Sequence, residues 1–342
     1  MLFIETRGSW REMGRQIGDA FPEQLRSCID YYAAWLVADL DRYRPAIAQI
    51  RDLISAHVPE LIDETAGLAE SSGIDEDTLL GYRFFNEVRE RISEGCSVVY
   101  VANSDVGPIL GRNCDLSATF DPDIQLCRTS RPTDGPDRIT TTYLGMAGAV
   151  GVNASGLGIG GASAHTQSHY GVEGLPGQIL NLLLMGRCGC VAEARDLLSR
   201  HAFLGKSQVL LTGDRDGASV LFEMAPGRTA EPVDRPPEQD WQICTNFFPS
   251  GRIPIDPEPM YLESAYARFG RMSHTLGAGL VERSVSGIQQ LLTDIAQPGL
   301  CIPQDHVTLQ TAYSQVMELA TGRMHIRPGH PEDASWQVVA LT

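Results

Sequence analysis

The sequence of 342 residues has few basic groups, and only one of them, Lys206, is a lysine. Chemistry that needs two Schiff-base lysines is therefore excluded. The net charge of −16 repels nucleic-acid phosphates, which makes nucleic acid a poor partner. No uncharged apolar run reaches the roughly 18 residues of a membrane span, and the N-terminus lacks the basic and apolar regions of a secretory signal. We expect a cytoplasmic protein without membrane contact.

Signatures of bound cofactors and metals are also missing. Residues 156–161 match the pattern G-x-G-x-x-G, but the residues that follow have no helical face, which argues against a dinucleotide site. His165 and His169 are four residues apart without a third ligand. The eight cysteines include one close pair, Cys188 and Cys190, and no second pair completes a zinc site. We expect no cofactor, no metal and reduced thiols.

The chain does contain enough apolar residues, 43%, for a globular core. Up to about residue 95 the apolar spacing is helical: Trp10, Met13, Ile17 and Phe21 recur every three to four residues, and 31–40 continue the pattern. Further helices are predicted at 44–57, 60–71 and 76–92. From residue 95 onward, short β-branched segments between turn residues become frequent. The character of the chain therefore changes near residue 95.

The second part of the chain alternates between runs of strands and pairs of helices. Strands are predicted at 97–101, 109–112, 124–130, 138–145, 149–153, 157–162, 207–212, 218–223, 239–245, 311–318, 323–327 and 335–341. Helices are predicted at 176–187, 191–201, 260–276 and 284–295. Such runs indicate an α+β protein in which helices lie on antiparallel sheets, and they disfavour a strictly alternating parallel sheet.

A cysteine lies directly at the boundary between the two parts, after a glycine, in Gly95-Cys96. The strands 97–101 and 109–112 flank a turn-rich segment and predict a hairpin. If its turn centres near residue 105, Cys96 faces position 114, and paired residues lie about 5 Å apart. Cys96, Arg112 and Asp115 are then expected to converge. A guanidinium beside the thiol favours the thiolate, and a carboxylate can accept hydrogen bonds from an amine.

Together, Gly95-Cys96 and the segment Gly-Arg-Asn-x-Asp at 111–115 resemble the N-terminal nucleophile (Ntn) hydrolases. Within them the sequence is similar to the choloylglycine hydrolase and acid ceramidase group. The closest likeness is to the acyl-coenzyme A:6-aminopenicillanic acid acyltransferases, peptidase family C45. Segments that match this branch in the same order are 7–18, 153–157, 245–246 and 264–269. The resemblance covers nearly the whole chain.

The resemblance implies a four-layer αββα sandwich of two antiparallel sheets, preceded by a helical N-terminal pro-segment. Self-cleavage between Gly95 and Cys96 would divide the chain into 1–95 and 96–342, which stay associated. The implied site consists of the nucleophile Cys96, the orienting residues Arg112 and Asp115, the oxyanion donors Asn246 and Asn153, and the supporting Arg268, for which Arg271 is a rival. Position 114, which varies among relatives, should face the core.

The chemistry of the Gly95–Cys96 bond supports the same interpretation without the family. An amide-cleaving thiol needs a base, and no histidine lies near Cys96 in the sequence. A free α-amine has a pKa of about 7.7–8.0, which suits proton transfer at neutral pH. Cleavage before Cys96 creates this amine beside the thiol. Because Gly95 has no Cβ, the thiol can reach its carbonyl carbon without obstruction.

The leading hypothesis is thus a self-processing hydrolase of linear amides outside peptide backbones, with a small-molecule amide or acyl substrate and its own cleaved N-terminal segment as partners. Transfer of the acyl group to an amine acceptor is a second hypothesis in the same fold. A third is an unprocessed binding protein without catalysis. The sequence decides neither between hydrolysis and transfer nor whether the protein is a homo-oligomer.

Overall fold

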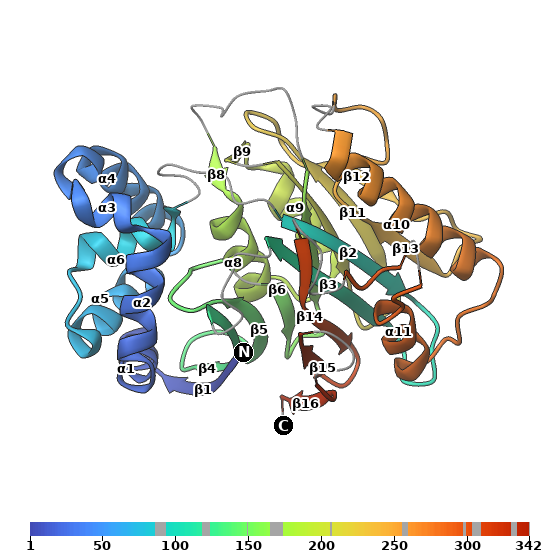
Figure 1. Cartoon of the computed structure of the whole chain (residues 1–342), viewed down its shortest axis with the longest axis horizontal. Coiled ribbons are helices and arrows are strands. Elements are labelled where there is room, and N and C mark those ends of the chain that lie inside the picture. The colour runs from blue at the N-terminus through green and yellow to red at the C-terminus, as the bar shows by residue number, and fades with distance from the viewer. Residues whose placement is uncertain are drawn as a thin grey trace.

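The computed structural model describes residues 1–85, 94–117, 124–148, 150–164, 174–205, 207–254, 259–296, 299–302, 309–329 and 334–341. The His165/His169 pair, Lys206 and the end of the helix predicted at 76–92 lie outside these residues. Two sheets face each other at the centre of the molecule, and the N-terminal helices lie to one side of them (Figure 1). No helix in the described part of the chain is long and apolar enough to cross a membrane.

The first sheet has eight strands. In spatial order these are β1 (Leu2–Gly8), β4 (Gln125–Pro132), β5 (Arg138–Tyr143), β6 (Val150–Asn153), β7 (Gly158–Ser163), β10 (Gln208–Gly213), β11 (Ser219–Met224) and β12 (Glu231–Asp234). All neighbouring strands are antiparallel except β1 and β4, which are parallel. Neither β1 nor β12 was predicted from the sequence.

The second sheet has six strands and carries the predicted hairpin at its centre. In spatial order these are β13 (Trp241–Cys244), β2 (Glu94–Val101), β3 (Ile109–Ser117), β14 (Leu309–Glu318), β15 (Arg323–Pro328) and β16 (Gln337–Ala340). All its neighbouring strands are antiparallel. A separate short pair joins β8 (Leu175–Pro176) to β9 (Phe203–Leu204).

Helices cover the outer face of each sheet. Contacts with the eight-stranded sheet come from α8 (Gly177–Arg187) and α9 (Val191–Ser199), and contacts with the six-stranded sheet come from α10 (Pro259–Gly277) and α11 (Val285–Leu292). Strands β2 and β3 pack against β7 across the interface between the sheets, where the larger apolar core lies. The predicted α+β sandwich of four αββα layers is confirmed.

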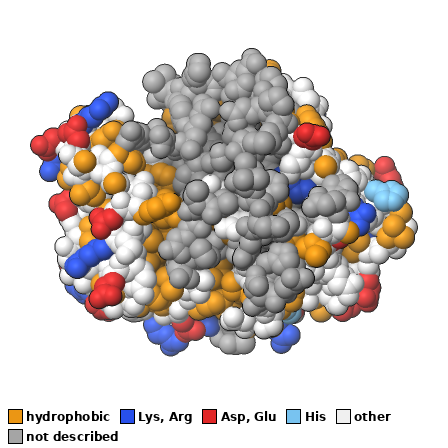
Figure 2. All heavy atoms as spheres, viewed as in Figure 1, with side chains coloured by type: hydrophobic (Ala, Val, Ile, Leu, Met, Phe, Trp, Pro, Cys, Tyr) orange, Lys and Arg blue, Asp and Glu red, His pale blue; other side chains and the backbone are white. Residues whose placement is uncertain are grey.

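The N-terminal segment consists of β1 followed by α1 (Trp10–Ala20), α2 (Pro22–Tyr32), α3 (Ala34–Ala38), α4 (Leu40–His57), α5 (Glu60–Ser72) and α6 (Glu76–Arg83). The helix predicted to continue through 31–40 is instead broken at Ala33 and Asp39. Helices α1 and α5 touch backbone to backbone, since a Cβ on Gly67 would lie 2.0 Å from the Arg11 carbonyl oxygen. Charged side chains of both signs and apolar side chains are interspersed over this segment, at the left of Figure 2.

A buried ion pair connects the N-terminal segment to the eight-stranded sheet. The carboxylate of Glu64 in α5, which is 3% exposed, lies 2.5 Å from Arg128 Nη1 of β4 and 2.6 Å from Arg83 Nη2 of α6. Burial by itself raises the pKa of Glu64, but the two guanidiniums outweigh it and lower the pKa to about 2. Glu64 and Arg128 lie on opposite sides of the Gly95–Cys96 bond, so their contact joins the N-terminal segment to the rest of the chain.

This pairing makes stability depend on acidity. A carboxyl group whose folded pKa is depressed contributes stability above its unfolded pKa of about 4.5, and that contribution is lost as the pH falls towards 2. We expect Glu64→Gln to be about 3 kcal/mol less stable than the wild type near neutral pH, with the difference closing towards pH 2. Urea unfolding across this range tests it. A difference that stays constant with pH would contradict the pairing.

Candidate active site

The hairpin of β2 and β3 sets the position of the predicted nucleophile. Its register pairs Cys96 with Cys114 and Gly95 with Asp115, as the sequence predicted for a turn near residue 105. Directly opposed residues of an antiparallel pair project from the same face of the sheet. Cys114 therefore lines the same cavity as Cys96. The prediction that position 114 faces the core is confirmed, since Cys114 is 3% exposed and belongs to the larger apolar core, and its side chain borders the cavity as well.

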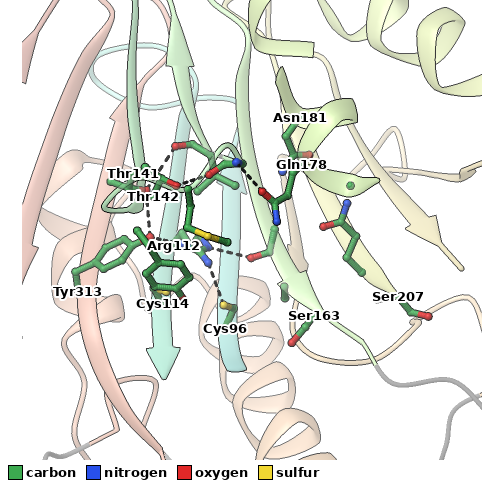
Figure 3. Close-up of a pocket in the computed structure, with 18 of the residues that line it drawn as sticks. Cys96, Arg112, Cys114, Thr141, Thr142, Ser163, Gln178, Asn181, Ser207 and Tyr313 are labelled. Carbon is green, nitrogen blue, oxygen red and sulfur yellow. Dashed lines mark hydrogen bonds between the residues drawn. The ribbon is translucent and has the colours of Figure 1, made fainter. Parts of the chain in front are cut away.

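Arg112 lies against the sulfur of Cys96, as predicted. Its Nη2 donates to Cys96 Sγ at 3.2 Å, and its Nε donates to the Gly161 carbonyl oxygen at 2.9 Å (Figure 3). Burial alone would lower the pKa of Arg112, but the nearby thiols of Cys114 and Cys96 raise it well above its usual value. The guanidinium therefore stays charged and is positioned to stabilise a thiolate.

A chain of buried hydrogen bonds fixes this guanidinium. Arg112 Nη1 donates to the Tyr313 hydroxyl at 2.7 Å, Tyr313 donates to Thr141 Oγ1 at 3.1 Å, and Thr141 donates to Gln315 Oε1 at 2.8 Å. Tyr313 and Gln315 come from β14 and Thr141 from β5, far from Cys96 in sequence. Our sequence analysis missed all three residues, because no local pattern marks them.

The backbone of Cys96 is held by Asn246 and Arg268. The Cys96 N–H donates to Asn246 Oδ1 at 2.9 Å, and Arg268 Nη1 donates to the Cys96 carbonyl oxygen at 2.6 Å. Arg268 Nη2 also donates to Asn246 Oδ1 at 2.9 Å. The rival Arg271 is instead paired with Asp294 on a partly exposed surface. Of the two candidate arginines, the structure therefore brings only Arg268 to Cys96.

The Asn246 amide group reaches across to the other sheet. Its Nδ2 donates to the Ser163 carbonyl oxygen at 2.9 Å and to the Ser163 hydroxyl at 3.4 Å. Ser163 ends β7 and lines the same cavity as Cys96. It is a further site residue that the sequence analysis did not identify. The Asn246 amide therefore lies between the Cys96 backbone and the end of β7.

Asp115 is completely buried on the other face of the hairpin. Its Oδ1 accepts a hydrogen bond from Thr311 Oγ1 at 2.7 Å, and its Oδ2 lies 3.7 Å from Arg268 Nη1. No described residue donates a hydrogen bond to Oδ2. A Cβ on Gly95 would lie only 3.3 Å from this oxygen, so this acceptor lies beside Gly95. Burial raises the pKa of Asp115, and Arg268 partly offsets this.

Asn153 is the one predicted site residue that the structure does not bring to Cys96. Its Nδ2 donates to the carbonyl oxygens of Met185 and Cys188, at 3.1 and 2.8 Å, and its Oδ1 accepts from Leu157 N–H. Both amide hydrogens are therefore used. These contacts join the β6–β7 turn to the end of α8, and they favour a structural role for Asn153.

A cavity of about 170 Å³ opens in front of Cys96 between the two sheets and α8. Figure 3 places Gln178 and Asn181 of α8 across this cavity from Cys96 and Arg112. Its lining combines these polar side chains with apolar ones, namely Tyr143, Met146, Val150, Ala162, Phe203 and Tyr313. Such a mixture suits a small organic substrate with one or two polar groups. Within the described ranges, no three side chains of His, Cys, Asp or Glu gather in a metal-binding group.

One family model agrees with the resemblance found in the sequence. The family model described as acyl-coenzyme A:6-aminopenicillanic acid acyl-transferase matches residues 102–333. Among solved structures, a mutant conjugated bile acid hydrolase from Clostridium perfringens aligns at 13% identity and a TM-score of 0.47, over 72% of this chain and 92% of that one. Penicillin V acylase from Agrobacterium tumefaciens aligns at 14% identity and a TM-score of 0.44, over 72% of this chain and 86% of that one. No curated protein matches the chain significantly.

Proposed function

Because the chain belongs to the acyl-coenzyme A:6-aminopenicillanic acid acyl-transferase family, we propose that it is a self-processing cysteine amidase that works through an acyl-Cys96 intermediate. Membership makes it an enzyme of the amidohydrolase and acyltransferase type with an Ntn-hydrolase fold. The proposal adds the nucleophile, the cleavage site and the bond that is attacked. That bond is a linear amide outside a peptide backbone.

The observation that supports the proposal most strongly is the environment of the Cys96 sulfur and of the Gly95–Cys96 bond. The sulfur has a charged guanidinium at 3.2 Å, and a Cβ on the preceding Gly95 would lie 3.3 Å from Asp115 Oδ2, a buried acceptor without a described donor. A buried unsatisfied carboxylate oxygen is costly. Release of the Cys96 α-amine would supply an ammonium donor to this oxygen. We therefore expect Asp115 Oδ2 to be better satisfied after cleavage than before it.

Maturation begins with attack of Cys96 Sγ on the Gly95 carbonyl carbon. The carbon–sulfur bond forms, the carbon–nitrogen bond breaks, and the thiol proton passes to the departing nitrogen. Water then hydrolyses the thioester, giving Gly95 a carboxylate and returning the thiol. The products are chains 1–95 and 96–342. The parallel pairing of β1 with β4 and the Glu64–Arg128 ion pair support their continued association.

Turnover repeats this chemistry on a substrate amide. The α-amine of Cys96 takes the thiol proton, and the sulfur attacks the substrate carbonyl carbon. The Asn246 amide exchanges its long contact with the Ser163 hydroxyl, 3.4 Å, for a hydrogen bond to the oxyanion, which lowers the barrier by roughly 3–4 kcal/mol. The proton moves from the α-amine to the leaving nitrogen, and water releases the acid. Arg112 orients the sulfur, while Arg268 and Asp115 hold the backbone and the amine.

Trapping the acyl-enzyme tests this proposal. A series of acyl p-nitroanilides mixed with the enzyme and quenched in acid should give protein whose mass is increased by the acyl group, on the peptide that begins with Cys96. Added amines then separate hydrolysis from transfer, because a constant yield of acid as the amine concentration rises means hydrolysis only. Turnover without acylated Cys96 at any quench time would refute the proposed intermediate.

A further inference from the structure

A second cavity lies between the N-terminal helices and the eight-stranded sheet, and the chemistry above does not use it. Arg128 of β4 and Arg138 of β5 project into it, with Ser130 and Thr140 beside them. The register pairs Arg128 with Thr140 and Ser130 with Arg138, so these four residues share one face of the sheet. Trp10 and Glu64 close it from the helical side. We call it the arginine cavity.

The arginine cavity has an excess of positive charge. Glu64 is the carboxylate that lines it, and this group already pairs with Arg83 and Arg128. Arg138 is only 5% exposed; the contact that the structure gives its guanidinium is the Trp10 ring, at 4.7 Å from the centroid. Arg128 Nη2 is buried without a hydrogen-bond acceptor among the described residues. The buried Nη2 of Arg128 and the buried guanidinium of Arg138 thus have donors that no described oxygen accepts.

The protonation state of Arg138 reflects this excess. Burial, together with the like charge of Arg128, lowers its pKa to about 10. It therefore remains charged at neutral pH. A buried charge without a full partner costs free energy that a counter-anion would recover.

The cavity is small and borders the catalytic one. Its volume of about 30 Å³ admits roughly two water molecules, a size that fits the two oxygens of a carboxylate. Thr142, Met146 and Asn181 line both cavities. Arg138 and Thr142 lie on the same strand, about 13 Å apart along it. Asn181 Oδ1, at this junction, is also buried without a donor from the described chain.

We propose that the arginine cavity binds a carboxylate of the substrate, so that the enzyme selects amides carrying an anionic group remote from the scissile bond. The acyl or amine chain of the substrate would run from Cys96 to the arginine cavity past Thr142 and Asn181. Asn181 Oδ1 could accept a hydrogen bond from a substrate N–H. This inference rests on the proposed function, because it assigns part of the substrate of that site. The carboxylate site itself can be tested without turnover.

Direct binding is the first test. Thermal unfolding of the whole protein in suberate is compared with sodium chloride at equal ionic strength, and with 1,6-hexanedisulfonate. Suberate should raise the melting temperature saturably in the wild type and in the control Arg200→Gln, whose arginine lies on the surface. It should not do so in Arg138→Gln. An equal effect of the disulfonate, or of chloride, would overturn the assignment to a carboxylate.

Selectivity is the second test. In the first series the carboxylate is on the acyl group: p-nitroanilides of ω-carboxyacyl chains, from succinyl to sebacoyl, are each compared with the p-nitroanilide of the methyl-ended chain of equal length. In the second series the carboxylate is on the leaving amine, in octanoyl amides of ω-amino acids. At the best length we expect kcat/KM to be at least about tenfold higher for the carboxylate, as charge-assisted hydrogen bonds allow. The ratio between paired substrates does not depend on how much of a variant folds.

Arg138→Gln should bring this ratio near one, Arg138→Lys should leave it intermediate, and Arg200→Gln should leave it unchanged. A preference in either substrate series supports the proposal. Ratios near one in both series would overturn the claim about the substrate, even if suberate still binds. If no amide is hydrolysed at all, the proposed function fails, and the thermal shift alone decides whether a carboxylate site exists.

Discussion

Replacing Cys96 with alanine is expected to leave a single chain of 37.3 kDa and to slow amide hydrolysis by about 10³-fold or more. Without the sulfur, neither the Gly95 carbonyl nor a substrate carbonyl has a nucleophile. Without cleavage, the Cys96 nitrogen remains an amide, so the base is lost together with the attacking group. Gel electrophoresis and a p-nitroanilide assay measure both effects in one preparation.

The matched control for this variant is Cys127→Ala. Cys127 is a buried thiol of β4, and burial raises its pKa to about 12, which keeps it protonated and unreactive. Its loss should leave both cleavage and hydrolysis intact. If Cys96→Ala were cleaved, or hydrolysed amides as fast as Cys127→Ala, Cys96 could not be the nucleophile.

The Arg268→Met variant should show the largest loss of stability. Arg268 is 2% exposed and donates to the Cys96 carbonyl oxygen, to Ser97 Oγ and to Asn246 Oδ1, while facing the carboxylate of Asp115. Removing one partner of a buried pair leaves the other charge uncompensated, at a cost of about 3–5 kcal/mol. Urea unfolding should reveal this loss, and self-cleavage should slow because the Cys96 backbone loses its anchor.

Arg271→Met provides the comparison, since it removes the same side chain three residues along α10. Its guanidinium pairs with Asp294 and is 35% exposed, so we expect a loss of at most about 1 kcal/mol. Equal effects of the two substitutions would mean that the buried contacts of Arg268 contribute little. A larger effect of Arg271→Met would favour that residue as the supporting arginine.

The local parts of the fold could be predicted from the sequence, and the long-range parts could not. The turn-rich segment at 103–108 fixed the hairpin, and with it the pairing of Cys96 with Cys114. By contrast, β1 becomes a strand only because it pairs with β4, more than 100 residues later. The helix expected through 31–40 breaks at Ala33 and Asp39, where the pattern of apolar spacing alone gave no stop signal.

The residues of the candidate site also divide into those that local sequence predicts and those that only long-range contacts bring to Cys96. Arg112 and Asp115 follow from the hairpin, whereas Asn246 and Arg268 were identified only through the family resemblance. Both reach Cys96 because β13 pairs with β2 and α10 packs on that pair. Tyr313, Thr311 and Ser163 complete the site from strands that only the tertiary fold brings near. A single sequence carries no signal for such contacts.

The most direct measurement is the intact mass of freshly purified wild-type protein under denaturing conditions. We predict two species that correspond to residues 1–95 and 96–342, whose masses add up to the unsplit chain plus one water. The heavier species should carry a free amino-terminal cysteine that condenses with 2-cyanobenzothiazole. An unsplit chain that nevertheless hydrolyses amides would contradict the claim that one residue supplies both the attacking sulfur and the base.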